Sequence, residues 1–262
     1  MKIYALMENI SHDECLACEH GLSLYIEADG KKILFDTGAS ENFAANAEKM
    51  GVDLKAVDFA AISHGHYDHG GGLAKFIEIN GHAPIYISNK GFNQYYSGTD
   101  FNVSIPEGLE GNPRFVLTSE PIKLSENITL LNCNDREAKY FADPYGLNKL
   151  VDGEFIPDDF LHEQYLIIEE NGKRIVISGC SHKGILNIME WLKPDILIGG
   201  FHFFRLTTEG EDAATLDKSA AILNEYGATY YTCHCTGTEQ YEYLKAQMPK
   251  LNYIATGDVI EF

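Results

Sequence analysis

His64-Gly65-His66-Tyr67-Asp68-His69 is the most informative run in this chain of 262 residues. It places three imidazoles and a carboxylate within six positions, and titratable groups are rarely concentrated in this way without a function. In an extended loop His64 and His66 project to the same side. Asp68 and His69 follow after a bend and can face a second point. Because zinc, iron and manganese accept nitrogen and oxygen ligands together, the run predicts two metal positions, one for each pair.

The run lies between a predicted strand and a predicted helix. Residues 59–63 are apolar and of strand length, and Gly70-Gly71-Gly72 leads into a helical pattern at 73–78. This order of strand, ligand loop and helix places the histidines at a strand end. The other elements predicted before residue 90 are strands at 3–7, 22–27, 32–35 and 84–88 and a helix at 40–50.

Several later strands also end in loops that carry glycine and histidine. Ligand sites gather at such strand ends in α/β proteins, because the backbone leaves the sheet there and side chains can converge. Residues 90–160 are rich in turn residues and predict no regular order, and no repeat or linker is visible, so we predict a single domain over residues 1–262. The later elements predicted are strands at 165–168, 174–177, 195–198 and 228–231 and helices at 212–226 and 239–248.

The composition limits the partners and the compartment. There are 39 acidic and 20 basic residues, a formal charge of −19, which would repel a nucleic-acid backbone. No run approaches membrane-spanning length and the first apolar segment is soon interrupted by Glu8, so we expect a cytoplasmic protein with no membrane partner. The six cysteines are then expected to be reduced, and the single pair Cys15 and Cys18 to be free thiols.

Together with Asp36-Thr37-Gly38 upstream, the histidine run resembles the signature of the metallo-β-lactamase superfamily. The segments 179–182, 199–202 and 234–237 resemble the later motifs of one subgroup, which includes proteins of the dihydropterin-ribofuranosylaminobenzene-phosphate synthase type and many metal-dependent hydrolases. The resemblance implies an α/β fold, a four-layer αβ/βα sandwich of two mixed β-sheets flanked by helices. It also implies a site for two metal ions at one edge of the sandwich.

The resemblance assigns metal ligands residue by residue. His64 and His66 would bind the first ion, with His182 as the choice for its third ligand. The second ion would be bound by Asp68, His69 and His234. Reserve candidates, which precede the strand at 165–168, are Asp159, His162 and Glu163.

Cys180 departs from the family pattern, because many members have an aspartate there that bridges the two ions. A thiolate at this position would be a soft ligand that favours zinc. A thiol that points into the core would leave no protein bridge, and we favour this second interpretation. Cys233 and Cys235 alternate with His234 in extended chain and are expected to be small buried residues.

Further histidines and one aspartate receive roles near the ions. His202 follows two glycines at a strand end and is predicted to donate a proton or bind an anionic oxygen, with a hydrogen-bonded structural histidine as the alternative. Asp36 is expected to accept a hydrogen bond that orients a ligand histidine or the histidine loop. Structural roles are expected for His12, His20 and His82.

These residues predict a metal-dependent hydrolase acting on a small ester, phosphoester or lactone. Two divalent ions, zinc or alternatively iron or manganese, would lower the pKa of bound water from about 15.7 toward about 7 and so provide hydroxide for attack. Asp68 would act as ligand and proton acceptor and His202 as the acid. Two alternatives stay open: a phosphoribosyl-type synthase, with Lys183 and Arg205 near a phosphate, and a metal-binding sensor or inactive binding protein. The aromatic residues at 92–101 either cover the substrate or pack in the core.

Overall fold

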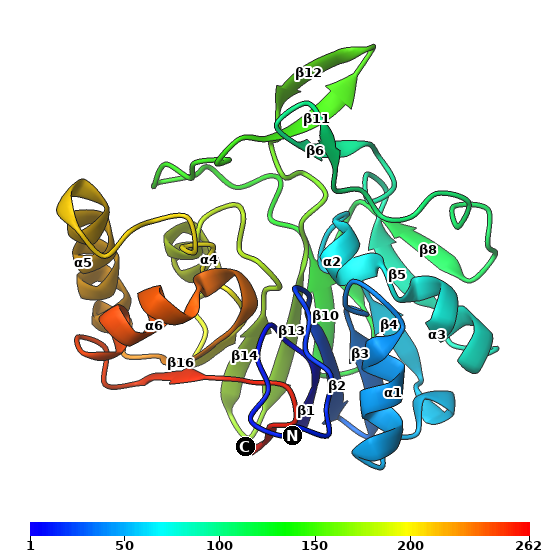
Figure 1. Ribbon diagram of the computed structural model, residues 1–262. Helices are drawn as coiled ribbons and strands as arrows, with labels where there is room; N and C mark the ends of the chain where they lie inside the picture. Colours follow the sequence, from blue (N-terminus) through cyan, green and yellow to red (C-terminus); the bar gives the residue numbers. More distant parts are fainter.

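The computed structural model describes residues 1–262, and two large sheets form its centre (Figure 1). The first sheet has the order β18-β1-β2-β3-β4-β5-β8, antiparallel from β18 to β3 and parallel from β3 to β8. The turn Asp29-Gly30, with positive φ at both residues, closes the β2–β3 hairpin, as is usual for this dipeptide. The strands are β1 (Lys2–Met7), β2 (Ser23–Ala28), β3 (Lys31–Phe35), β4 (Phe59–Ala61), β5 (Ile85–Ser88), β8 (Phe115–Thr118) and β18 (Val259–Glu261).

The second sheet has the order β17-β16-β15-β14-β13-β10-β9. Its strands pair antiparallel from β9 to β14 and parallel from β14 to β17. The carboxyl ends of β14, β15 and β16 therefore meet at one edge. The strands are β9 (Ile122–Lys123), β10 (Ile128–Leu131), β13 (Tyr165–Glu170), β14 (Lys173–Ile177), β15 (Ile196–Ile198), β16 (Thr229–Thr232) and β17 (Leu251–Tyr253).

Alternating side chains on these strands build a layered core. In β14, Ile175 and Ile177 join the cluster between the two sheets, whereas Val176 joins the cluster under the helices. Both faces of the strand are thus buried, which explains its apolar sequence. Figure 1 shows α1 and α3 on one flank and α4, α5 and α6 on the other. The helices are α1 (Asn42–Lys49), α2 (Tyr67–Gly70), α3 (Leu73–Ile79), α4 (Ile185–Leu192), α5 (Gly210–Glu225) and α6 (Thr238–Lys245), with single turns at Leu54–Ala56 and His234–Thr236.

A third, smaller sheet is formed by part of the segment for which no order was predicted. It has the order β12-β11-β6-β7, and its β11–β12 hairpin projects from the body of the protein (Figure 1). Three of the aromatic residues at 92–101 pack: Tyr95 is buried, Phe92 contacts Phe115 and Tyr96 contacts Phe155. Phe101 is 57% exposed. The strands are β6 (Tyr95–Ser97), β7 (Phe101–Asn102), β11 (Leu147–Val151) and β12 (Glu154–Pro157).

The predicted α/β sandwich of two mixed sheets flanked by helices is confirmed, and the predicted strands and helices agree with the structure to within a few residues at their ends. No helix of the chain is both long enough and apolar enough to span a membrane.

Candidate metal centre

The predicted ligands come from loops that follow four strands. β4 leads into the histidine run and α2, and β14 leads into the loop that carries His182. β15 leads to His202, and β16 to His234. Because β14, β15 and β16 run parallel, their loops emerge at the same edge of the second sheet and face the loop from the first. The fold thus gathers residues separated by up to 170 positions into one buried group.

One cluster consists of the three histidines predicted for the first ion. The ligand atoms offered by His64, His66 and His182 all lie within 4.8 Å of one another, and Nε2 of His182 is 3.2 Å from Nε2 of His64. All three side chains are buried. Burial holds the pKa of each ring below its usual value, that of His66 at about 3. The imidazoles are therefore neutral at pH 7, which is the form that binds a metal.

A second cluster surrounds Asp68. Its Oδ2 atom lies 3.2 Å from Nε2 of His234 and 3.8 Å from Nε2 of His69, so the three residues predicted for the second ion are together. His20 also joins them, with Nε2 3.2 Å from Asp68 Oδ2. His20, for which a structural role was expected, thus lies among the residues predicted for the second ion. The neighbouring Gly21 permits this approach of the two loops, since a Cβ there would lie 2.8 Å from the Asp68 carbonyl oxygen. No pattern in the sequence marks this contact.

Hydrogen bonds hold the second nitrogen of several of these rings. Asp36 Oδ2 accepts from Nδ1 of His69 at 2.7 Å, which confirms the predicted contact. Asn9 Oδ1 lies 2.8 Å from Nδ1 of His234, and Ser63 Oγ lies 2.8 Å from Nδ1 of His64. Such contacts set the orientation of the ring and leave Nε2 for a metal. The sequence carries no pattern that marks Asn9.

The carboxylate of Asp36 also influences the charge of the centre. Burial acts to lower the pKa of His69, but the carboxylates of Asp36 and Asp68 outweigh burial and raise it. For Asp68, burial acts to raise the pKa, whereas His69 and hydrogen bonds from His20 and His234 bring it well below its usual value. Asp68 is thus a carboxylate at neutral pH, as a metal ligand must be.

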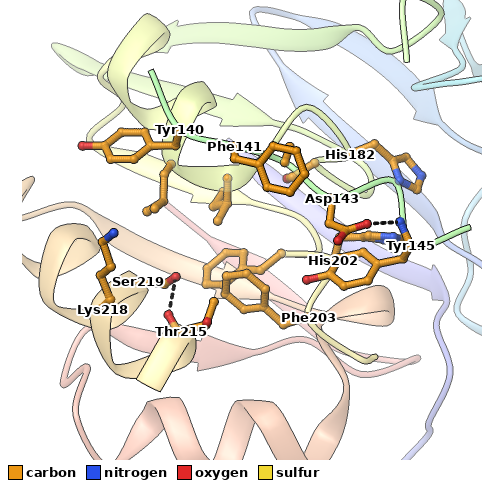
Figure 2. Close-up of a pocket in the computed structure, with 16 residues that line it drawn as sticks. Tyr140, Phe141, Asp143, Tyr145, His182, His202, Phe203, Thr215, Lys218 and Ser219 are labelled. Atoms are coloured by element: carbon orange, nitrogen blue, oxygen red, sulfur yellow. Dashed lines mark hydrogen bonds between the residues drawn. The ribbon is translucent and has the colours of Figure 1, made fainter. Parts of the chain in front are cut away.

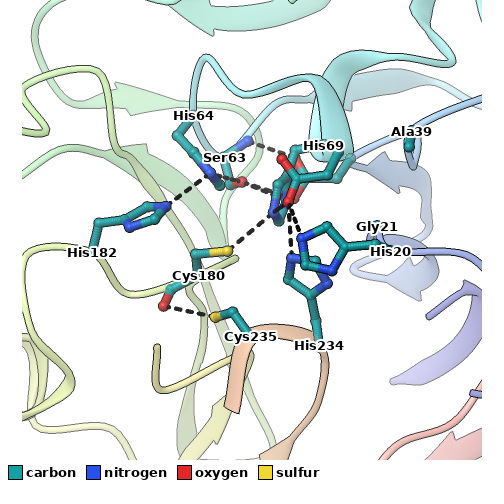
Figure 3. A network of polar contacts seen from close by, with 12 residues as sticks. His20, Gly21, Ala39, Ser63, His64, His69, Cys180, His182, His234 and Cys235 are labelled. Carbon is teal, nitrogen blue, oxygen red and sulfur yellow. Dashed lines mark hydrogen bonds and ion pairs between the residues drawn. The ribbon is translucent and has the colours of Figure 1, made fainter. Parts of the chain in front are cut away.

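Cys180 does not point into an apolar core. Its Sγ atom lies 3.1 Å from Nε2 of His69 and within reach of His64, as Figure 3 shows. The favoured interpretation of this thiol is therefore wrong. Cys233 and Cys235 are buried, as predicted, and Cys235 donates a hydrogen bond to the carbonyl oxygen of Cys180.

His202 is buried, and neither ring nitrogen has a hydrogen-bond partner. The alternative of a hydrogen-bonded structural histidine is therefore wrong. Burial is the main cause that lowers its pKa to about 3, so the ring is neutral at pH 7. A neutral ring offers an N–H group to a substrate oxygen. An anion beside the ring would raise the pKa of His202, so that the ring could take up a proton and donate it.

The reserve candidates support the centre from outside it. Glu163 accepts hydrogen bonds from the backbone N–H groups of His182 and Lys183 and so holds their loop. His162 accepts from the N–H of Gly65 through Nδ1 and contacts Asp158 Oδ2 through Nε2 at 3.0 Å. A group of possible ligands formed by His66, Asp158 and His162 adjoins the first cluster. Asp158, which the sequence did not single out, is thus the buried carboxylate of this segment, whereas Asp159 pairs with Lys149.

The two cations considered for a phosphate lie in different settings. Nζ of Lys183 donates to the carbonyl oxygens of Asn132 and Glu163 at 2.7 and 3.1 Å, so this ammonium is engaged within the protein. Lys183 also lines a cavity beside His182, so its role toward a phosphate stays a prediction. Arg205 is exposed and lines a cavity beside the centre.

Two cavities beside the centre are lined by both His182 and His202, and a third, of about 490 Å³, is lined by His182, Asp158 and Lys183. The first, of about 190 Å³, also contacts Asp68, Phe101 and Arg205. The second, of about 220 Å³, lies between the segment 140–145 and helices α4 and α5, and Figure 2 shows aromatic rings along it. A substrate can therefore approach the histidines from two sides.

The donors fit divalent metal ions. Buried polar atoms without a partner cost about 1–3 kcal/mol each. His66 Nε2, His182 Nδ1 and both nitrogens of His202 are such atoms. Imidazole, carboxylate and thiol groups are the donors that zinc prefers. The residues present therefore suit a metal centre.

Comparisons with known proteins agree with this geometry. Residues 17–216 match the family model of the metallo-beta-lactamase superfamily. The chain is 31% identical over 263 aligned positions to 7,8-dihydropterin-6-methyl-4-(beta-D-ribofuranosyl)-aminobenzene-5'-phosphate synthase of Methanocaldococcus jannaschii, covering 90% of this chain and 88% of that protein. An uncharacterised protein of the same archaeon is 29% identical, with 90% of each chain covered. A solved structure of a metal-dependent hydrolase of the beta-lactamase superfamily is 28% identical, with a TM-score of 0.82 over 100% of this chain and 99% of that one.

Proposed function

The chain belongs to the metallo-β-lactamase superfamily, and from this premise we propose that it is a metal-dependent hydrolase of small esters, phosphoesters or lactones. The observation that carries the proposal is the pair of ligand clusters at one edge of the sandwich, with the ligand atoms of each cluster within 4.8 Å of one another. A purely structural role does not explain why buried imidazole nitrogens lack partners there.

Two divalent ions, which we expect to be zinc, would occupy the clusters. His64, His66 and His182 would hold the first ion, and Asp68 and His234 the second, with His69 and His20 beside it. Bound there, the ions would lower the pKa of a water molecule and polarise the substrate oxygen. Nitrogen-rich donors of this kind favour zinc, with iron or manganese as alternatives.

The chain's own groups orient the substrate and move protons. The Asp68 carboxylate is buried and charged, so it is placed to accept a proton as well as to hold an ion. His202 lies between the two cavities and can donate its N–H to a developing negative charge on the substrate. Phe101 and Phe204 line the smaller cavity and limit the access of water to it.

The size of the cavities supports a small substrate. The two cavities lined by His202 have volumes of about 190 and 220 Å³, and the one of about 490 Å³ beside His182 lies in the lower part of the about 300–1,000 Å³ range of common ligand pockets. The net charge of −19 disfavours a nucleic acid as the substrate. All six cysteines are unpaired, which supports a reducing compartment such as the cytoplasm.

A metal analysis joined to an activity assay tests the proposal. Purified protein would be analysed for zinc, iron and manganese, then assayed with phosphodiester, phosphomonoester, carboxylic ester and lactone substrates before and after dialysis against a chelator. We expect about two ions per chain and chelator-sensitive hydrolysis of one substrate class. Two ions with no turnover of any class would point instead to a metal-binding sensor. A protein that binds no divalent ion would contradict the site.

The relative named as a synthase favours a second candidate, a synthase acting on a phosphoribosyl-type substrate. Arg205, exposed beside the smaller cavity, is the cation that would face a phosphate. Product analysis separates the two candidates, since a synthase joins two substrates and a hydrolase consumes water. Incorporation of oxygen-18 from labelled water into the product would favour the hydrolase.

A further inference from the structure

Cys180 is held firmly at the centre of the site by its two neighbouring loops. Gly179, which precedes it, has φ +65°, and a Cβ there would lie 2.5 Å from Ser63 Oγ, so the loop is pressed against the histidine run. On the other side, Cys235 donates a hydrogen bond to the carbonyl oxygen of Cys180. The backbone at and before Cys180 is thus packed against a loop from each of the two sheets.

The sulfur atom of Cys180 belongs to two groups of ligand atoms. With His64 and His69 it forms one group, and with His182 and His202 it forms another, each with all ligand atoms within 4.8 Å. His64 and His182 belong to the cluster of the first ion, whereas His69 borders that of the second. Figure 3 shows Cys180 between His182 and His69.

An independent observation indicates that this space takes a ligand. His202, which shares a group with Cys180, is buried and has no hydrogen-bond partner at either ring nitrogen. Nδ1 of His182 is also without a partner. One ligand atom of each of these rings lies within 4.8 Å of the thiol, and buried imidazole nitrogens without partners would be stabilised by a cation between them.

Cys233 shows how an inert buried cysteine in the same protein is surrounded. It is fully buried within the apolar cluster between the two sheets. Cys180, which is 2% exposed, instead has ligand atoms of four imidazoles within 4.8 Å of its sulfur. The two thiols are equally hidden from solvent, so the difference between them lies in their neighbours.

Resting on the proposed two-metal site, we propose that the Cys180 thiolate is a protein ligand shared by the two ion positions. It takes the place of the bridging aspartate found in many members of the family. On binding, the S–H bond breaks, its proton passes to solvent, and the sulfur lone pairs form the bonds to the ions. A soft sulfur ligand selects zinc, cobalt or cadmium over magnesium or manganese.

Cobalt(II) substitution tests this role without a substrate, because a thiolate bound to cobalt gives a sulfur-to-metal charge-transfer absorption in the near ultraviolet. The full chain would carry Cys15→Ser and Cys18→Ser, since these exposed thiols could bind cobalt themselves. Cobalt would be added stepwise to this parent and to its Cys180→Ser, Cys180→Asp and Cys235→Ser forms. Circular dichroism checks that each form is folded.

We expect the parent and the Cys235→Ser form to develop the band, with growth over both equivalents of cobalt. The Cys180→Ser form should lose the band and bind cobalt more weakly. The loss of affinity should exceed the about 10- to 100-fold that follows removal of a residue that only hydrogen-bonds to a ligand. The Cys180→Asp form should bind two equivalents with no band. It provides a carboxylate bridge and keeps the test informative if the serine form is unstable.

Four results would overturn the proposal. A band that persists in the Cys180→Ser form assigns the ligand to another cysteine. If the band stops growing after the first equivalent of cobalt, Cys180 binds one ion and is not shared by the two ion positions. Two equivalents of cobalt bound by the parent with no band contradict thiolate ligation but leave the proposed metal site in place, whereas failure of the parent to bind cobalt contradicts both.

Discussion

At the scale of single residues, the arrangement of the histidines depends on carboxylates that the ions would not touch. Asp36 accepts from Nδ1 of His69, and both its oxygens accept hydrogen bonds from Ser63. Its φ of 60° is one that aspartate and asparagine adopt more readily than other residues with a Cβ. Charge and backbone conformation thus both favour aspartate at this position.

The Asp36→Asn substitution therefore separates the charge of this residue from its shape. Asparagine tolerates the same φ, but its NH₂ group would face His69 Nδ1–H and the Ser63 hydroxyl as a second donor. We expect metal affinity to fall by about 10- to 100-fold while the fold is kept. Competition with a coloured chelator measures the affinity. Asp58→Asn, at an exposed aspartate just before β4, is the control, and equal affinities in both variants would show that Asp36 does not orient a ligand.

Removing ligands of the first ion tests the central assignment. His64→Ala and His66→Ala each delete one imidazole of a three-histidine cluster, which leaves too few donors for tight binding. Elemental analysis should show the loss of at least one ion per chain in each variant. His82→Ala, at an exposed histidine that belongs to no group of possible ligands, should retain the full metal content. Unchanged metal in the first two variants would mean that the ligands lie elsewhere.

At the scale of elements, the centre depends on how closely strand-end loops approach each other. Gly179 at the end of β14 and Gly172 in the β13–β14 turn have similar positive φ values of 65° and 71°. A Cβ at Gly172 would meet nothing within 4 Å, whereas one at Gly179 would lie 2.5 Å from Ser63 Oγ. The two glycines differ in packing and not in conformation.

Alanine at these two positions should consequently have unequal costs. Gly172→Ala carries only the backbone penalty of about 1–2 kcal/mol. Gly179→Ala adds displacement of the Ser63 loop, an overpacking cost of about 1–3 kcal/mol, and should also weaken metal binding. Urea unfolding gives the two free energies of unfolding. Similar values for the two variants would show that the contact between β14 and the histidine loop relaxes at no cost.

At the scale of the whole molecule, the centre joins the two sheets. His64 and Asp68 follow a strand of the first sheet, and His182 and His234 follow strands of the second. Ions held by both sets would bind the folded protein and not the unfolded chain. Metal binding therefore adds to the stability of the whole sandwich by mass action.

Chelation should lower the melting temperature of the wild-type protein. Free zinc at about 1,000 times its dissociation constant would stabilise the fold by about 4.1 kcal/mol, provided that the unfolded chain does not bind it. Thermal unfolding followed by circular dichroism, with zinc and with a chelator, measures the difference. In the His64→Ala/His66→Ala double variant, the difference in melting temperature between the two conditions should be smaller. A wild-type melting temperature that is the same in both conditions would contradict a metal that joins the sheets.

The sequence by itself predicted most strands of the two large sheets and the helices other than α2 and α4, and it indicated two metal positions at the histidine run. These depend on local periodicity, as in the alternation of Ile175, Val176 and Ile177, or on ligands a few residues apart. The resemblance to a known family supplied the sandwich and the distant ligands.

The tertiary structure alone decided where side chains point after a strand ends. It brought His20 to Asp68, turned Cys180 toward His69 and engaged Lys183 with Glu163. It also ordered the third sheet from a segment without clear periodicity. Cys180 and His69 are 111 residues apart, and their contact results from the packing of Gly179 against Ser63. Contacts of this kind depend on how separate loops pack against each other, which no local pattern in the chain encodes.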